Sequence, residues 1–343
     1  MSKHVNIIGS SYNKGMFSQI LGWTLQMLPY IDYNYVQKGV IPKFRLESHI
    51  YGRYPDYSII PSLIIPKLKP TEYRWNKREF ITKYQMKFIE TRDNNYNKNF
   101  LSYKTKFKLA NKMFNKYFKI NDEIINSVND YVKKNFNGFT LGIHFRGTDK
   151  IPHRSNKVTI DLFCDVIKDI LKTKEINTIF ICSDTKHIIE KFIKNINKID
   201  NKINVIFYEQ ELVNDFSKRG FHIRRCDEIM KAIKNEDFEE VKKISKYNNE
   251  LAKNALKDSL LLSKCNMVIK TQSQLSAWAK IFNPDIDVLR IGGMQYFWWP
   301  EVFIPLYKTN DKELQNKLNL VNSNDIPDSL RDKVSDFSKY NLT

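Results

Sequence analysis

The chain has 343 residues and a mass of 40.8 kDa, which is long enough for two compact domains. Lys and Arg number 56 against 38 Asp and Glu, and the net charge of +18 favours anionic partners such as nucleotides or nucleic acid, although a solvated lysine-rich surface would give the same value. No apolar run approaches the roughly 18 residues of a membrane span, and residues 1–15 do not have the pattern of a signal peptide, so we expect a cytoplasmic protein without a transmembrane segment.

The N-terminal third predicts a strand at 4–8, a turn-rich loop at 9–15 and a helix at 16–28. This loop either approaches a ligand or is an ordinary turn between a strand and a helix. Aromatic and basic residues alternate through residues 73–84, which is typical of a surface for single-stranded nucleic acid and equally of a peripheral substrate surface. No RNA-binding motif is found, so no specific nucleic-acid partner is predicted. Residues 91–135 are expected to be mainly helical.

Beyond residue 138 strands and helices alternate, which predicts a doubly wound parallel sheet in an α/β protein. The expected strands are 139–145, 178–182, 203–208, 266–269 and 286–291. The expected helices are 160–171, 185–196, 236–264, which we expect to be interrupted, and 273–282, with another at 311–320. The predicted organisation is therefore an N-terminal domain at 1–135, a second domain at 136–305 and a peripheral tail at 306–343.

The first of three unusual strand ends is the sequence Gly-Ile-His-Phe-Arg-Gly-Thr-Asp-Lys. Period-two alternation puts His144 and Arg146 on one face, with Arg146 at the end of the strand, where its guanidinium can bind a diphosphate through two hydrogen bonds. Asp149 can orient Arg146, and Lys150 adds a positive charge. The alternative is a surface Arg–Asp ion pair beside a tight turn.

The other two strand ends carry acidic and hydroxyl side chains. The second, Ile-Phe-Ile-Cys-Ser-Asp-Thr, delivers Asp184 to the same edge, although Asp184 could equally be a helix N-cap. The third runs from Asp258 on a helix, through a short strand, to Thr271, Gln272 and Ser273. Hydroxyl groups beside the free N–H groups of a helix start form an anion site, while simple N-capping by Ser273 is the alternative and is compatible with it.

Together these three segments resemble the motifs of the GDP-fucose-dependent fucosyltransferases. The first resembles the pattern His-x-Arg-Arg-Thr-Asp-Lys of the α-1,6 and nodulation enzymes, whose α-1,2 and protein O-fucosyltransferase relatives keep His-x-Arg. The second resembles Ala-Thr-Asp-Asp at a strand end, and the third resembles an Asp, a Leu-Ser pair, a strand and Thr-x-Ser-Ser. The resemblance covers roughly residues 140–290. Gly147, Thr185 and Gln274 depart from it, and these departures bear on the donor and acceptor more than on the fold.

The resemblance implies a GT-B fold, in which two Rossmann-like domains face a cleft, and an inverting transfer of fucose from GDP-fucose to a glycan hydroxyl. Arg146, Lys150 and Asp149 are the implied catalytic residues, with Asp149 or His153 as candidate general base. The implied donor-binding residues are His144, Arg146, Asp184, Asp258, Thr271, Gln272 and Ser273. His144 and Asp258 would read guanine. No cofactor and no metal are expected, since the chain has no DxD motif at a strand end.

Three other functions are also compatible with the sequence. The first is a GT-B glycosyltransferase that uses GDP-mannose or a UDP-sugar. The second is a basic nucleic-acid-binding protein built on the surface at 73–120. The third is an inactive glycosyltransferase fold, which the substitutions at Gly147 and Thr185 permit.

Overall fold

The computed structural model describes residues 4–8, 17, 41–45, 52–53, 57–58, 64–66, 107–146, 158–210, 228, 231–232, 234–293 and 301–322. The chain forms two compact units. The first comprises Met1–Ile124, His222–Lys253 and Ser329–Thr343, and the second comprises Ile125–Phe221 and Asn254–Asp328. These bounds differ from the ranges 1–135, 136–305 and 306–343 predicted from the sequence, because the chain returns to the first unit after residue 221.

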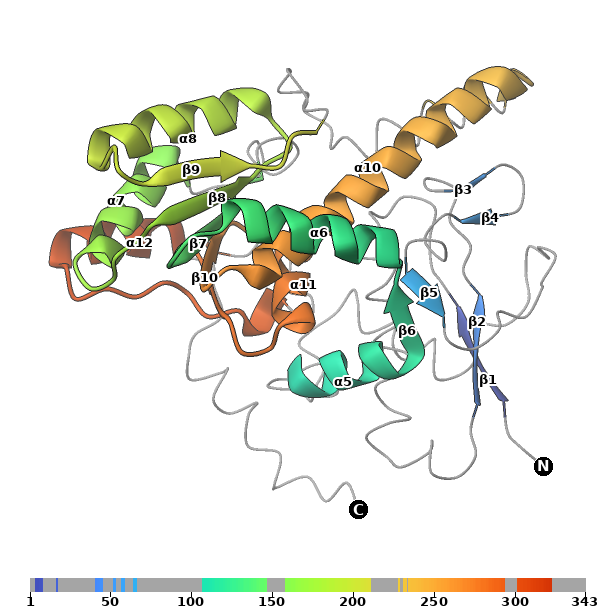
Figure 1. The fold of residues 1–343 in the computed structure, drawn as a ribbon, viewed down its shortest axis with the longest axis horizontal. Coiled ribbons are helices and arrows are strands. Elements are labelled where there is room, and N and C mark those ends of the chain that lie inside the picture. Colours follow the sequence, from blue (N-terminus) through green and yellow to red (C-terminus); the bar gives the residue numbers. More distant parts are fainter. Residues whose placement is uncertain are drawn as a thin grey trace, which may run out of the picture. The chain divides into compact units, whose positions relative to one another are not determined.

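The second unit is built on a five-stranded parallel sheet with the strand order β11-β10-β7-β8-β9 (Figure 1). Its strands are β7 (Thr140–His144), β8 (Thr178–Cys182), β9 (Asn204–Phe207), β10 (Met267–Lys270) and β11 (Asp287–Arg290). The predicted α/β class and the doubly wound parallel sheet are therefore confirmed.

Helices cover both faces of this sheet, which is why its strands are almost continuously apolar. The first face packs on α7 (Ile160–Leu171), α8 (Lys186–Ile199) and α12 (Lys312–Asn322), and it contributes alternate residues to one hydrophobic core. The core residues of β7 and β8 are Leu141, Ile143, Ile179 and Ile181.

The opposite face packs on α6 (Asp122–Asn135), on the C-terminal part of α10 (Phe238–Lys264) and on α11 (Gln274–Phe282). A Cβ atom at Gly142 would lie 3.0 Å from the Cys265 sulfur and 3.1 Å from a Leu262 methyl carbon. The glycine thus allows the end of α10 to pack closely against β7. On α6, the ring of Tyr131 packs at 6.3 Å from that of Phe180 on β8.

Helices α7, α8 and α11 lie within about three residues of their predicted ranges. Helix α7 begins at the predicted residue, where the Thr159 hydroxyl accepts from the amide of Leu162 at 3.1 Å, an N-cap. Helix α10 is one continuous helix from Phe238 to Lys264, so the interruption expected within 236–264 is not present.

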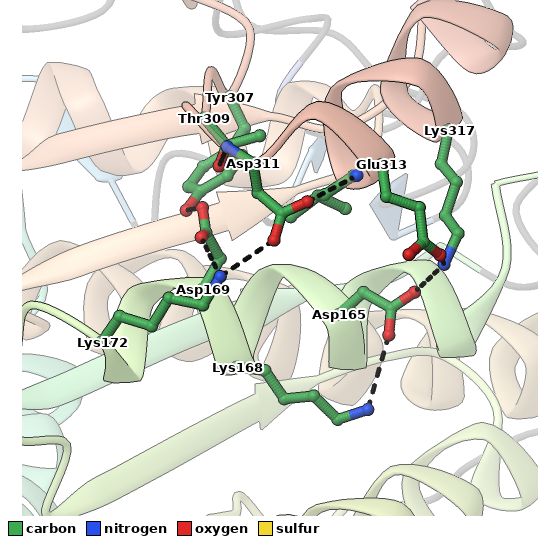
Figure 2. A network of polar contacts seen from close by, with 10 residues as sticks. Asp165, Lys168, Asp169, Lys172, Tyr307, Thr309, Asp311, Glu313 and Lys317 are labelled. Carbon is green, nitrogen blue, oxygen red and sulfur yellow. Dashed lines mark hydrogen bonds and ion pairs between the residues drawn. The ribbon is translucent and has the colours of Figure 1, made fainter.

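Helix α12 lies in the segment predicted to be a peripheral tail, yet it belongs to the core of the second unit. Its residues Leu314, Leu318 and Val321 are buried in the cluster beneath α7. Polar contacts between α7 and the segment that leads into α12 surround this packing (Figure 2). Lys172 bonds Asp169 at 3.2 Å and Asp311 at 2.9 Å, and the hydroxyl of Tyr307 donates to Asp169 at 2.9 Å. Exposed ion pairs of this kind add little individually, so the three buried apolar residues do most to hold α12.

The described residues of the first unit form three two-stranded sheets. The strand predicted at 4–8 is confirmed as β1 (His4–Ile8), which pairs in parallel with β2 (Ile41–Arg45). The other pairs are antiparallel: β3 (Gly52–Arg53) with β4 (Tyr57–Ser58), and β5 (Ile64–Pro66) with β6 (Phe118–Ile120).

The region 91–135, predicted to be mainly helical, contains α5 (Phe107–Tyr117) and α6, but β6 lies between them. The sequence pattern that predicts a helix continues through Phe118–Ile120. In the structure these residues pair with β5 and form a strand instead. Of the predicted helix 16–28 only Phe17, which is helical and buried, is described, and the predicted surface at 73–84 lies outside the described residues. Within the described part of the chain, no helix is both long and apolar enough to cross a membrane.

Candidate active site at the switch point of the sheet

The strand order creates a single point where ligands collect in sheets of this kind. Strands β8 and β9 follow β7 on one side, whereas β10 and β11 extend the sheet from the other side of β7. The connections leaving β7 and β10 therefore run to opposite sides and leave a crevice at their carboxyl ends, which is the usual ligand position in doubly wound sheets. The first and third sequence segments end at these two strands.

Hydrogen bonds join the two strand ends directly. The backbone amide of Arg146 donates to the Thr271 hydroxyl oxygen at 3.1 Å, and the amide of Thr271 donates to the carbonyl of His144 at 3.0 Å. Thr271 is fully buried, while Arg146 is partly exposed. Arg146 thus lies just after the end of β7, as the sequence predicts. In addition, the hydroxyl of Thr271 holds the backbone of Arg146 in this position.

The turn after Thr271 opens helix α11 with an unusual N-cap. Ser273 occupies the N-cap position with extended backbone angles (φ −165°, ψ 137°), but its side chain makes no capping hydrogen bond. The side chain is only 3% exposed, and among the described residues its Oγ atom has no hydrogen-bond partner. Since buried hydroxyl groups are normally paired, a hydroxyl of this kind at a helix N-terminus is suited to an anion that the chain itself does not supply.

His144 faces the same helix from the end of β7. Its Nδ1 atom lies 3.0 Å from the hydroxyl of Ser276 in the first turn of α11, and that hydroxyl also lies 3.4 Å from the Ser273 carbonyl oxygen. His144 and Ser276 are both buried. The orientation of the imidazole ring is therefore set by the helix that carries the candidate anion site.

The second segment ends at the neighbouring strand. Asp184 is partly exposed and accepts a hydrogen bond from the Thr185 hydroxyl at 3.2 Å. The N-cap residue of α8 is Thr185, so the alternative in which Asp184 caps this helix is not what the structure shows. The carboxylate of Asp184 lies at the carboxyl edge of the sheet, beyond the end of β8.

Asp258 reaches this edge from α10, which packs against the sheet. The side chain is 5% exposed, and its Oδ2 atom accepts a hydrogen bond from Nε2 of Gln210 at 2.9 Å. Burial raises the pKa of Asp258 to about 7, partly opposed by hydrogen bonds from Gln210 and from the thiol of Cys182 at the end of β8. A buried carboxyl group with this pKa at the ligand edge of a sheet is typical of a functional group.

A buried ion cluster supports the other side of the crevice. The ammonium group of Lys270, the last residue of β10, lies 2.5 and 2.6 Å from the two carboxylate oxygens of Glu301. Arg290, the last residue of β11, lies 3.7 Å from Glu301 and donates to the Gly292 carbonyl at 2.6 Å. All three side chains are at most 1% exposed. The contacts with Glu301 thus hold the side chain of Lys270, the residue that directly precedes Thr271, in place.

The structure brings most of the predicted site residues to one edge. His144, Arg146, Thr271 and Ser273 lie at β7 and β10, and Asp184 and Asp258 lie around β8. Gln272 is buried in the turn between Thr271 and Ser273. Asp149, Lys150, Gly147 and His153 lie outside the described residues. The roles of all these residues remain predictions.

Sequence reasoning missed Gln210, Ser276 and the cluster of Lys270, Arg290 and Glu301. A lysine at the end of the apolar run Met-Val-Ile-Lys is a detectable signal, since a charged residue ending a buried strand needs a partner. The partner Glu301 has no such signal, because it is 31 positions away and lies in a short 3-10 turn. Gln210 follows β9 without any motif.

Comparisons with known proteins give structural resemblance and no match by sequence. No family model and no curated protein matches the chain. A crystal structure of the fucosyltransferase NodZ from Bradyrhizobium is similar with a TM-score of 0.48 and 12% identity, over 83% of this chain and 94% of that chain. NodZ α-1,6-fucosyltransferase soaked with GDP-fucose has a TM-score of 0.46 and 12% identity over 84% and 95%. POFUT1 in complex with GDP-fucose has a TM-score of 0.30 and 8% identity over 49% and 44%.

Proposed function

We propose that the chain is an inverting glycosyltransferase that transfers fucose from GDP-fucose to a hydroxyl group of a glycan. The observation that carries the proposal is the hydrogen bond between the Arg146 amide and the Thr271 hydroxyl, which unites the first and third motifs at the switch point of the sheet. The GT-B arrangement of two domains around a cleft belongs to the same proposal.

The diphosphate of the donor is assigned to the end of β10 and the start of α11. The N–H groups of the first helical turn and the buried Ser273 hydroxyl supply neutral donors for phosphate oxygens. Arg146, whose backbone is bonded to Thr271 beside this turn, is assigned the positive charge, with Lys150 as a second cation. Because these groups can neutralise the leaving group, the proposed reaction needs no metal.

The guanine base is assigned to the side of β8. Asp258 lies beside the end of β8, where it contacts Cys182, and the phosphate site lies at the end of β10, with β7 between these two strands. This separation suits a nucleoside diphosphate that lies across the strand ends, with its base at Asp258 and its phosphates at α11. A carboxylate suits guanine because the N1–H and the 2-amino group of this base are both donors, whereas uracil offers one such donor.

The chemical step is a displacement at the anomeric carbon of fucose. The acceptor oxygen forms a bond to this carbon while the bond to the β-phosphate oxygen breaks, and GDP leaves with the electron pair. The negative charge on the diphosphate grows during this step, so a cation fixed at its oxygens stabilises the transition state more than the bound substrate. Arg146 is assigned this role. The proton of the acceptor hydroxyl passes to a general base, for which Asp149 and His153 are the candidates.

The direct test is donor hydrolysis, since water can replace the unknown acceptor. The protein is incubated with GDP-fucose, GDP-mannose or a UDP-sugar, and nucleotide release is measured with and without EDTA. The proposal predicts release of GDP from GDP-fucose in excess of the other donors, in EDTA as well. Preference for another donor would favour that glycosyltransferase, and dependence on a divalent metal would contradict the metal-free site. RNA affinity that falls steeply with salt, without GDP binding, would favour the nucleic-acid alternative.

A further inference from the structure

We propose that Gln210 is a positioning residue for guanine, which holds the Asp258 carboxylate in the orientation and charge state that the base requires. The inference rests on the proposed function, in which Asp258 reads guanine, and it adds a residue that belongs to none of the three motifs.

The contact between the two side chains assigns their roles. Nε2 of Gln210 lies 2.9 Å from Oδ2 of Asp258. An ionised carboxylate only accepts hydrogen bonds, so the nitrogen of the Gln210 amide, and not its oxygen, faces it. A carboxylate has about four acceptor positions on its two oxygens. Gln210 uses one of them and the thiol of Cys182 uses another, which leaves two for the two adjacent donors of guanine.

The position of Gln210 is fixed by a framework at the end of β9. The hydroxyl of Tyr131 on α6 donates to the carbonyl of Phe207 at 2.7 Å, and its ring packs at 5.5 Å from that of Tyr208. Lys257, the neighbour of Asp258 on α10, donates to the Tyr208 hydroxyl at 2.8 Å. The segment that carries Gln210 is thus tied to both α6 and α10 just before it reaches Asp258.

The charge state of Asp258 depends on Gln210 because the carboxyl group is almost entirely buried. Burial raises its pKa to about 7, and the bond from Gln210 lowers it, as does the bond from Cys182. The other ionisable groups around it are Tyr131 on α6, Asp184 and Cys182 at the end of β8, Cys265 after α10, and Tyr208, Glu209 and Lys257 beside Gln210. Among these groups, the pKa of Tyr131 and that of the Cys182 thiol are raised, so both side chains stay neutral near pH 7.

The test compares wild type with Gln210→Leu, which keeps the approximate volume of the side chain and removes the donor. Gln315→Leu is the matched control, because Gln315 lies on α12 at the opposite face of the sheet. Calorimetric affinities for GDP and UDP are measured at pH 6.5 and pH 8.5. Gln210→Leu is expected to lose on the order of tenfold in GDP affinity at pH 6.5 and less than about twofold at pH 8.5, because the unsupported carboxyl needs a higher pH to ionise. UDP affinity should be unchanged at both values.

A second measurement needs no nucleotide. The unfolding midpoint of the ligand-free protein is followed from pH 6 to pH 9, and its fall with rising pH should extend to higher pH in Gln210→Leu than in wild type or in Gln315→Leu. Equal affinities for GDP and UDP in wild type would contradict the proposed function, while the unfolding data would still test the link between Gln210 and Asp258. A wild type that prefers GDP, with a Gln210→Leu variant that keeps the same preference at both pH values, would overturn the inference alone.

Discussion

The backbone amide of Arg146 donates to the hydroxyl oxygen of Thr271 at 3.1 Å, although the two residues are 125 positions apart in the sequence. The bond joins the ends of β7 and β10, the two strands between which the direction of the sheet reverses. It therefore couples the stability of the second unit to the geometry of the proposed donor site.

Thr271→Val should destabilise the protein, because valine keeps the shape of threonine but leaves the Arg146 amide without its acceptor. The loss of a partner for a partly buried N–H group costs about 1–3 kcal/mol. Chemical denaturation of the variant and of wild type measures this difference in the free energy of unfolding. An unchanged free energy of unfolding would show that the bond does not hold the two strand ends together.

Ser273→Ala should leave the stability of the protein almost unchanged but weaken GDP binding. The Ser273 hydroxyl has no partner among the described residues, so its removal should change the free energy of unfolding by less than about 0.5 kcal/mol. GDP affinity should fall roughly tenfold, the effect of losing a hydrogen bond to a charged phosphate oxygen. Calorimetry with GDP and chemical denaturation separate the two effects. A variant that is destabilised yet binds GDP like wild type would identify Ser273 as a structural cap.

The C-terminal sheet could be predicted from the sequence because each strand is an apolar run and each helix has a 3.6-residue pattern. The ends of β8 at Thr178 and Cys182 agree with the prediction. Segment β6 could not be predicted, because its partner β5 is more than fifty positions earlier and pairing between distant segments leaves no local signal. Helix α12 was expected to be peripheral because its polar residues outnumber the three apolar residues that reach the core.

In the candidate site, too, the residues with a local sequence signal were predicted and those without one were not. Arg146, Thr271 and Ser273 were predicted because they follow strands or begin a helix in recognisable segments, and Asp258, which lies inside α10, was predicted from its motif. The Gln210 amide and the Ser276 hydroxyl were not, since they act through neighbours that only the folded chain provides. The capping role of Ser273 was half correct: it has the position of an N-cap but lacks the hydrogen bond of one.

Asp258→Asn should make the protein more stable above neutral pH. The pKa of Asp258 is raised from 3.8 to about 7, so the folded state holds this proton more tightly than the unfolded state. The stability that comes from the protonated group is complete below about pH 4 and is lost as the pH rises through about 7, at a cost on the order of 4 kcal/mol. Asparagine cannot ionise, and it can still accept from Gln210. Unfolding at pH 5 and pH 8 should therefore show a more stable variant at both values, with the larger advantage over wild type at pH 8; an advantage that does not grow between pH 5 and pH 8 would contradict the assignment.

Arg146→Ala should fold normally, since Thr271 binds the backbone amide and not the side chain of this residue. Turnover of GDP-fucose should fall by about 10² to 10³, with kcat affected at least as much as KM, because the charge that Arg146 meets develops during bond cleavage. Arg146→Lys should be similarly impaired, since an ammonium group cannot make the two parallel hydrogen bonds of guanidinium. Lys312→Ala, an exposed change on α12, is the control. A soluble Arg146→Ala protein with wild-type turnover would remove Arg146 from the mechanism.

Calorimetric titration of the wild-type protein with GDP and with UDP at pH 8 tests the central claim most directly, because Asp258 is then ionised and no acceptor is needed. The phosphate site at Ser273 and α11 should bind both nucleotides, while the carboxylate of Asp258 distinguishes their bases. We expect GDP to bind at least about tenfold more tightly than UDP, a difference of about 1.4 kcal/mol that one charged hydrogen bond can supply. Equal affinities, or no binding of either nucleotide, would contradict the assignment of this edge of the sheet to a guanine nucleotide.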